Sequence, residues 1–300
     1  MTALAIHAFP GFEAEAEKLA AATGLPLRSV DIHTFPDGES RVKVQPGAGT
    51  AVLFAGLDHP DGRLVPLILA ASALRDGGAD RIVLACPYLC YMRQDMAFTP
   101  GEAVSQRVIG ELLAQYFDRI ITVDPHLHRI SALAEVMPGV EADTLSAAAL
   151  IGDIIAADPV LAGAVLVGPD GESRQWVSVA AGRAGCDFLV ASKVRHGDRN
   201  VQISLPHAEE AKGRPAVIVD DLVSSGTTIC RAAEILTEAG ATRVEAIAVH
   251  VLASQPALKA MAKAGVSRVR SSSSITHPTN AFSLAPLFAA ALEKELKHGN

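Results

Sequence analysis

The residues best suited to chemistry are two adjacent acids followed by a loop of small hydroxyl residues. Asp220 and Asp221 follow an apolar, β-branched run at 216–219, which is typical of a strand covered on both faces. The loop consists of Ser224, Ser225, Gly226, Thr227 and Thr228. A helix that starts there points its positive end at a bound anion, and carboxylates accept hydrogen bonds from sugar hydroxyls. The pattern predicts a ligand with a polyol part and a phosphate; for an isolated acid pair, a helix N-cap with solvated carboxylates is the alternative.

Other polar groups also follow strand-like runs. They are Arg93, Gln94, Asp95, Asp124, His126, Asp170, Lys193 and Arg195. Each alone has an ordinary explanation, because loops are polar in any protein. Arg93, for example, could pair with Asp95 or Asp118. Ligands of open α/β sheets bind outside the carboxyl ends of the strands, so this shared position favours a common functional role.

Strand-like and helix-like segments alternate along the chain and would position these groups. The predicted strands are 4–9, 50–55, 81–86, 119–123, 164–167, 187–191, 216–219, 244–250 and 266–270, and residues 29–44 are extended around a turn at 35–39. The predicted helices are 13–22, 64–74, 102–116, 147–156, 174–184, 229–240, 256–264 and 284–296. This order predicts an α/β fold with mostly parallel sheets. The number of strands suits two domains, with a break at 139–144.

Composition narrows the class of protein. The 300 residues are 49% hydrophobic and carry a net charge of −7 without a long basic run, which argues against a nucleic-acid-binding protein. The four cysteines form no Cys-x-x-Cys pair, so we expect buried free thiols in a reducing cytoplasm. Cys86 and Cys90 could share a metal, but no second pair supports a zinc site. We expect no signal peptide and no membrane span, and hence a cytoplasmic protein.

The polar motifs together resemble those of the ribose-phosphate pyrophosphokinases, also called phosphoribosyl diphosphate synthetases. The resemblance runs from about residue 35 to the C-terminal helix. The matching segments are Phe35-Pro36-Asp37-Gly38-Glu39, Pro87-Tyr88 with Arg93-Gln94-Asp95, Asp124-Pro125-His126, Gly168-Pro169-Asp170, Lys193-Val194-Arg195 and the loop at 220–228. The last motif is shared with all type I phosphoribosyltransferases, whereas the Asp-Gly-Glu and Arg-Gln-Asp segments are more specific. The resemblance implies two type I phosphoribosyltransferase-like domains, 1–143 on the ATP side and 144–283 with the ribose-5-phosphate loop, followed by a helix at 284–300.

The resemblance also implies a reaction and a role for each motif. The anomeric hydroxyl of ribose 5-phosphate would attack the β-phosphorus of ATP, and AMP would leave. Lys193 and Arg195 would stabilise the transferring group from a closing loop, and His126 and Asp170 would hold Mg²⁺ with ATP. ATP would be bound by Phe35, Asp37, Glu39, Arg93, Gln94 and Asp95, and ribose 5-phosphate by Asp220, Asp221 and the loop Ser224–Thr228. In the family the Asp-Gly-Glu turn serves a neighbouring subunit, which implies a homo-oligomer with Asp37 and Glu39 near an interface.

Three departures from the family pattern indicate a divergent branch. Ser224 stands where many members have an acid, Glu172-Ser173 where many have Gly-Gly, and 96–100 lacks the basic residues common after Arg-Gln-Asp. The second departure alters a turn near the metal site, and the third bears on ATP handling and on regulation by phosphate or ADP. Two other functions stay open: a catalytically silent regulatory homologue, and a phosphoribosyltransferase that consumes the activated sugar.

Overall fold

The chain folds into two compact units. The computed structural model describes residues 4–47, 49–127, 129–195 and 201–298, with the backbone alone at 193–195, 201–202 and 298. Unit 1 comprises Met1–Leu145, Ser273–Thr276 and Ser283–Asn300, and unit 2 comprises Ser146–Ser272 and His277–Phe282. The chain therefore leaves unit 1, builds unit 2 and returns to unit 1.

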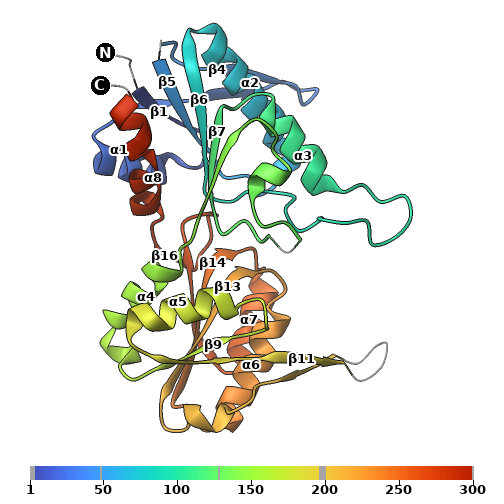
Figure 1. The fold of residues 1–300 in the computed structure, drawn as a ribbon, viewed down its shortest axis with the longest axis vertical. Coiled ribbons are helices and arrows are strands. Elements are labelled where there is room, and N and C mark those ends of the chain that lie inside the picture. Colours follow the sequence, from blue (N-terminus) through green and yellow to red (C-terminus); the bar gives the residue numbers. More distant parts are fainter. Residues whose placement is uncertain (1–3, 48, 128, 196–200, 299–300) are drawn as a thin grey trace. The chain divides into compact units, whose positions relative to one another are not determined.

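Unit 1 is built on a six-stranded parallel sheet with the order β2-β1-β5-β6-β7-β8. These strands are β1 (Leu4–Ala8), β2 (Leu27–Ser29), β5 (Gly49–Phe54), β6 (Ala79–Cys86), β7 (Arg119–Val123) and β8 (Glu141–Leu145). The helices of this unit are α1 (Glu13–Thr23), α2 (Leu64–Asp76), α3 (Ser105–Ala114) and α8 (Ala285–His298), with single turns of 3₁₀-helix at Pro60–Gly62 and Leu133–Glu135. A separate hairpin of β3 (Asp31–Thr34) and β4 (Ser40–Lys43) packs against α2. Figure 1 shows α8 beside α1, the two helices that are farthest apart in this unit's sequence.

Unit 2 repeats this architecture with the strand order β10-β9-β13-β14-β15-β16, again with parallel pairing throughout. These strands are β9 (Val165–Gly168), β10 (Asp187–Val190), β13 (Pro215–Val223), β14 (Arg243–Val251), β15 (Val266–Ser272) and β16 (Asn280–Phe282). Helices α4 (Ala148–Ala156) and α5 (Arg174–Ala184) cover one face, and α6 (Thr227–Glu238) and α7 (Gln255–Lys263) cover the other (Figure 1). Short 3₁₀ turns occupy Pro159–Leu161 and Ala208–Ala211, and β11 (Ser192–Arg195) pairs antiparallel with β12 (Val201–Ser204). Two mostly parallel sheets flanked by helices confirm the predicted fold class.

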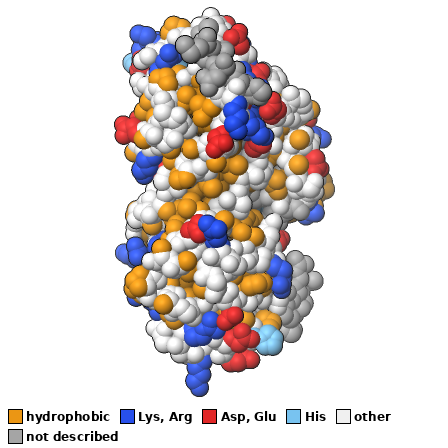
Figure 2. Space-filling view, turned by 60° about the vertical axis from the view of Figure 1, so that its left-hand side comes forward, with side chains coloured by type: hydrophobic (Ala, Val, Ile, Leu, Met, Phe, Trp, Pro, Cys, Tyr) orange, Lys and Arg blue, Asp and Glu red, His pale blue; other side chains and the backbone are white. Residues whose placement is uncertain are grey.

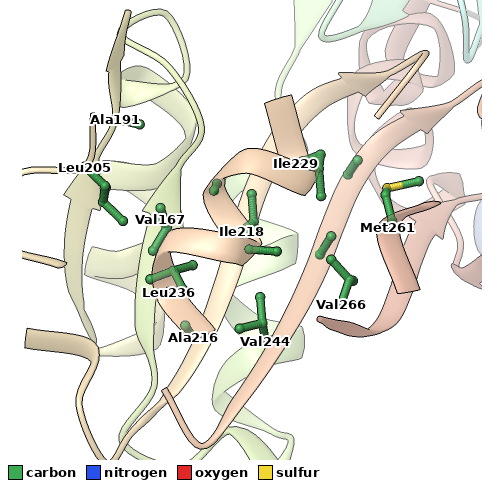
Figure 3. Close-up of a cluster of buried hydrophobic side chains, with 14 of the residues drawn as sticks. Val167, Ala191, Leu205, Ala216, Ile218, Ile229, Leu236, Val244, Met261 and Val266 are labelled. Atoms are coloured by element: carbon green, nitrogen blue, oxygen red, sulfur yellow. The ribbon is translucent and has the colours of Figure 1, made fainter. Parts of the chain in front are cut away.

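The core of unit 2 explains why α6 lies where it does. Ile229 and Leu236 of α6 are buried against Ile218 of β13 and Val244 of β14, as Figure 3 shows. These helix residues are seven positions apart and therefore share one face of the helix. The apolar face of α6 thus fixes this helix to the centre of the sheet, together with the loop at 224–228 that includes its first two residues.

The structure corrects the end of one predicted strand and adds a strand next to the expected break between the domains. β13 does not end at Val219 but continues to Val223, because β14 pairs with it as far as Val251. The break expected at 139–144 lies just before the boundary of the two units, between Leu145 and Ser146, and this segment contains most of β8, an edge strand with little apolar character that pairs with β7. Neither the continuation of β13 nor the strand β8 is visible in local hydrophobicity, since polar residues are tolerated where only one face or edge of a strand is covered.

The thiols and the surface agree in part with the sequence. Cys86 and Cys90 are buried free thiols, as predicted, and burial raises the pKa of Cys90 to about 12. Cys186 and Cys230 are free but partly exposed, which corrects the expectation for them. On the face shown in Figure 2, basic side chains lie beside acidic ones, without a continuous basic area among the described residues. Among the described helices, none combines the length and hydrophobicity that crossing a membrane requires.

Candidate functional site

The acid pair lies beyond the end of a neighbouring strand. β13 pairs with β9 only up to Ile218, so Asp220 and Asp221 extend past β9 at the carboxyl end of the sheet. Asp221 is only 3% exposed, and Asp220 is partly exposed. The pKa of Asp220 is raised well above its usual value, first by desolvation and then by the negative charges of Asp221 and Asp170. The structure therefore brings three of the predicted site residues of unit 2 within electrostatic reach of one another.

The hydroxyl loop forms the start of α6. Gly226 is the N-cap residue and has a left-handed backbone with φ of 75°, which explains glycine at this position. The Ser225 hydroxyl lies 3.1 Å from the Thr227 hydroxyl and accepts a hydrogen bond of 3.4 Å from the Thr227 N–H. Ser224, Ser225 and Thr227 are exposed. Exposed hydroxyls at the positive end of a twelve-residue helix form a suitable site for a phosphate group.

Asp170 is held in the turn between β9 and α5. Its Oδ1 accepts hydrogen bonds from the N–H groups of Glu172 (3.1 Å) and Ser173 (3.2 Å). The turn thus contains Glu172 and Ser173, the two residues at which the sequence departs from the Gly-Gly of the family pattern. The carboxylate of Asp170 is oriented by backbone amides, which keeps an oxygen ligand of the kind that Mg²⁺ prefers in a fixed place.

Lys193 and Arg195 lie on β11, one strand of the two-stranded hairpin. Lys193 pairs in register with Ile203 and Arg195 with Val201 of β12. The side chains of Lys193 and Arg195 lie outside the described residues, as do residues 196–200. Of the predicted closing loop, the structure therefore describes the backbone of Lys193 and Arg195 and the pairing of β11 with β12.

In unit 1, the Arg-Gln-Asp segment follows β6 and is tied to the beginning of α3. Arg93 is exposed, and neither acid considered for it is its partner among the described residues: Asp95 pairs with Arg129 at 3.5 Å, and Asp118 pairs with Arg75 at 2.6 Å. An exposed Arg93 is suited to contact a ligand phosphate.

Gln106, a residue that the sequence analysis missed, holds this segment from α3. Its side-chain amide donates to the Met92 carbonyl at 3.2 Å, and its backbone N–H donates to the Gln94 carbonyl at 3.2 Å. Gln106 is only 2% exposed. A buried polar side chain with a backbone partner stabilises one loop conformation, because an unsatisfied partner would be costly. A glutamine one residue into a helix carries no local signal for this contact.

Glu102 forms hydrogen bonds to the segment at 96–100, which lacks the basic residues of the family pattern. Its carboxylate accepts hydrogen bonds from the Phe98 N–H (2.7 Å), the Thr99 hydroxyl (2.6 Å) and the Gln94 side chain (3.5 Å). The Thr99 and Phe98 contacts lower the pKa of Glu102 below its usual value. The predicted ATP residue Gln94 therefore belongs to a hydrogen-bonded surface loop, in which Phe98, Thr99 and Glu102 are exposed.

The segment after β7 has a distinctive backbone. Asp124 and His126, which follow β7, both have positive φ values, of 37° and 55°. Positive φ is unfavourable for residues other than glycine and often occurs at functional sites.

The other predicted ATP residues lie on the β3–β4 hairpin. Phe35 is 41% exposed and lies edge-to-face with His33, and the exposed Asp37 and Glu39 occupy the turn.

His126 and Asp170, the predicted metal ligands, belong to different units. The described residues contain no group of three or more His, Cys, Asp or Glu side chains arranged to hold a metal ion.

Comparisons with known proteins agree with the two-unit architecture. Residues 6–116 match the N-terminal domain of ribose phosphate pyrophosphokinase, and residues 146–287 match the phosphoribosyl transferase domain. A ribose-phosphate pyrophosphokinase of Halobacterium salinarum is 36% identical, over 92% of this chain and 96% of its own. That of Methanopyrus kandleri is 32% identical, over 92% and 94%.

A solved structure supports the same fold. The phosphoribosylpyrophosphate synthetase of Mycobacterium smegmatis superimposes with a TM-score of 0.83 at 24% identity, covering 98% of this chain and 99% of that one. Similarity to relatives above 30% identity over nearly their full length, together with both domain matches, establishes the family. The chain belongs to the ribose-phosphate pyrophosphokinases.

Proposed function

We infer that the protein transfers the β,γ-pyrophosphoryl group of ATP to the anomeric hydroxyl of ribose 5-phosphate. The sugar oxygen forms a bond to the β-phosphorus, the bond from that phosphorus to the α,β-bridging oxygen breaks, and the hydroxyl proton is released. The products are phosphoribosyl pyrophosphate and AMP. The observation that carries this conclusion is full-length similarity to ribose-phosphate pyrophosphokinases, including the N-terminal domain named for that enzyme.

The other two candidate functions are not favoured. A phosphoribosyltransferase would account for the match at 146–287 but not for the match at 6–116. A silent regulatory homologue would have no use for the charged pair Lys193 and Arg195, which this chain retains. An active synthetase is therefore the candidate function that accounts for both matched regions.

We propose that unit 2 binds the acceptor. Asp220 and Asp221 would accept hydrogen bonds from the ribose hydroxyls, and the loop Ser224, Ser225, Gly226, Thr227 and Thr228 would bind the 5-phosphate. The raised pKa of Asp220 supports this assignment, because carboxylates forced together are relieved when hydroxyl donors or cations approach them. Phosphoryl-type transfer needs alignment and charge stabilisation more than covalent help, which suits a site of this kind.

We propose that Arg93, Gln94 and Asp95 bind ATP, with Phe35 available to stack on the adenine. Lys193 and Arg195 would stabilise negative charge on the transferring group. Asp170, with its amide-oriented carboxylate, fits Mg²⁺ as an oxygen ligand; His126, an unusual ligand for this hard ion, fits contact through water. Bound Mg²⁺ would supply charge neutralisation at the polyphosphate.

We further propose a cytoplasmic homo-oligomer. The four free cysteines support a reducing compartment. Asp37 and Glu39 are exposed in the turn of the β3–β4 hairpin, which leaves them accessible to a neighbouring subunit.

One assay tests the activity. Purified protein is incubated with ATP, Mg²⁺ and ribose 5-phosphate, and AMP is followed. We expect AMP and phosphoribosyl pyrophosphate in equal amounts, dependent on Mg²⁺ and absent when unphosphorylated ribose replaces the acceptor. Failure to form AMP at any inorganic phosphate concentration would contradict the proposal.

A further inference from the structure

Ser173 has an unusual role for a residue at the start of a helix. It is the N-cap residue of α5 and is only 1% exposed, yet its side chain makes no capping hydrogen bond to that helix. Serine at this position normally accepts a hydrogen bond from one of the first helical N–H groups. The hydroxyl is instead directed back into the preceding turn.

The partner of the Ser173 hydroxyl is Asp170. The hydroxyl donates to the Asp170 carbonyl at 2.5 Å and accepts from the Asp170 N–H at 3.3 Å. The Ser173 N–H also donates to Asp170 Oδ1 at 3.2 Å. Three hydrogen bonds from one residue thus fix both the backbone and the carboxylate of Asp170.

The place of this hydroxyl is set by the end of β9. A Cβ atom added to Gly168 would lie 2.4 Å from the Ser173 oxygen, so the hydroxyl occupies space that any larger residue at 168 would fill. On the other side, the Ser173 carbonyl accepts hydrogen bonds from the N–H groups of Trp176 (3.1 Å) and Val177 (2.9 Å). Because Val177 is fully buried, the first turn of α5 is fixed to the core. Ser173 therefore connects two rigid elements to the turn between them.

We propose that Ser173 is a positioning residue that sets the Asp170 carboxylate for a divalent cation. This inference rests on the proposed function, in which Asp170 meets Mg²⁺. Where a glycine would leave the turn free to rearrange, the buried hydroxyl holds Asp170 in one conformation before the cation arrives. Residues that orient a metal ligand without touching the metal typically change metal affinity when removed.

The single tryptophan of the chain provides a direct readout. Trp176 is partly buried in the first turn of α5 and is bonded to Ser173 through the backbone. Mg²⁺ is titrated into the protein with ATP present and ribose 5-phosphate absent, and tryptophan fluorescence is recorded. We expect Ser173→Ala to weaken the apparent Mg²⁺ affinity about tenfold. Ser173→Thr, which keeps the hydroxyl, is expected to restore most of the affinity.

A matched control is available on the same helix. The Ser178 hydroxyl donates to the Gln175 carbonyl at 3.3 Å and has no contact with Asp170, so Ser178→Ala is expected to leave Mg²⁺ affinity unchanged. In the AMP assay, Ser173→Ala is expected to raise the Mg²⁺ concentration for half-maximal rate and to leave the KM for ribose 5-phosphate unchanged. Thermal unfolding of each variant verifies folding.

The outcomes separate this inference from the proposed function. If the unsubstituted protein forms no AMP, the proposed function fails. If it forms AMP but Ser173→Ala lowers only the Tm and leaves Mg²⁺ affinity unchanged, Ser173 is a structural residue and the inference is overturned. An absent Mg²⁺ response of Trp176 in an active protein also overturns it, because the turn then does not meet the cation.

Discussion

A side chain at Gly226 would meet Met261: an added Cβ atom would lie 3.1 Å from the Met261 Sδ and Cε atoms. Gly226 also has a positive φ of 75°. The loop before α6 is therefore constrained by both its backbone and the helix packed behind it, and this gives the first prediction.

Gly226→Ala should reduce stability by ~1–2 kcal/mol from the left-handed backbone alone and should also raise the KM for ribose 5-phosphate. Gly240, beyond the other end of α6, has a φ of 89° and an added Cβ there would make only an ordinary 3.4 Å contact with Lys212. Gly240→Ala is therefore the matched control: it should lower the Tm similarly and leave the KM unchanged. Equal KM effects in both variants would contradict a phosphate-binding role for the loop.

Asp220→Asn should separate stability from acceptor binding. The pKa of Asp220 is raised in the folded state by desolvation, Asp221 and Asp170, so folded protein holds this proton more tightly than unfolded protein does. Stability is consequently lost as the pH rises from about 4 through the raised pKa. The asparagine variant should have a higher Tm than the unsubstituted protein at pH 8, with the difference shrinking towards pH 4.

The same variant should bind ribose 5-phosphate about tenfold more weakly, because it loses a charged hydrogen-bond acceptor. The exposed Glu209 offers a control, and Glu209→Gln should change neither quantity. A lower Tm of Asp220→Asn at pH 8 would refute the electrostatic account.

Lys193→Ala should lower the turnover number about 10²–10³-fold if the β11–β12 hairpin brings positive charge to the transferring group. The KM for ribose 5-phosphate should change little. AMP formation under saturating substrates measures the effect, with the exposed Lys212 replaced by alanine as the control. An unchanged turnover number would remove Lys193 from the mechanism.

Gln106→Leu should raise the KM for ATP about fivefold, since the Met92 carbonyl loses its 3.2 Å partner and the Arg-Gln-Asp loop loosens. Initial rates at varied ATP and fixed ribose 5-phosphate measure the change. Gln115 lies at the other end of α3, and its amide donates to the Glu111 carbonyl at 3.3 Å on the surface. Gln115→Leu should leave the KM for ATP unchanged; a rise of equal size in both variants would mean that the loop contact is irrelevant.

His7 should make the protein sensitive to acid. It is 1% exposed on β1, and its pKa is lowered from 6.5 to about 4 by desolvation and by the charge of Arg28. Unfolded protein takes up this proton as the pH falls below 6.5, whereas folded protein resists until about 4, so stability falls across that window by about 3 kcal/mol. His7→Leu should flatten the dependence of the Tm on pH between 6.5 and 4. His207→Asn, a change of an exposed imidazole, should not.

Local sequence patterns were sufficient to predict most helices and strands and to find the polar motifs. The predicted helix at 174–184 and the strand at 119–123 coincide with α5 and β7, because their ends carry clear signals such as Gly185 after α5. Polar strand ends were harder to predict: the sequence indicates that the strand ends at Asp220 and Asp221, and only pairing with β14 shows that β13 continues beyond them. The side chains that shape the candidate site from outside, Gln106 and Ser173, were not predictable as such, because their partners are set by tertiary packing or by a turn with several possible conformations.

The contact between α8 and the sheet of unit 1 has no local signal at all. Arg119 is 1% exposed and pairs with Glu295 at 3.0 Å, and Arg81 pairs with the same carboxylate at 3.0 Å. The two arginines lower the pKa of Glu295 below its usual value despite its burial. No pattern within a window of residues could pair side chains so far apart in sequence.

This ion pair determines the order in which the protein can be completed during synthesis. Glu295 follows Arg119 by 176 residues, an interval of roughly 9–35 s at ordinary translation rates. During that time the ribosome synthesises all of unit 2, while Arg119 can already pair with Asp143 but still lacks Glu295. Unit 1 is therefore begun first and finished after unit 2 has emerged, so a nascent chain holds an incomplete first unit until α8 arrives.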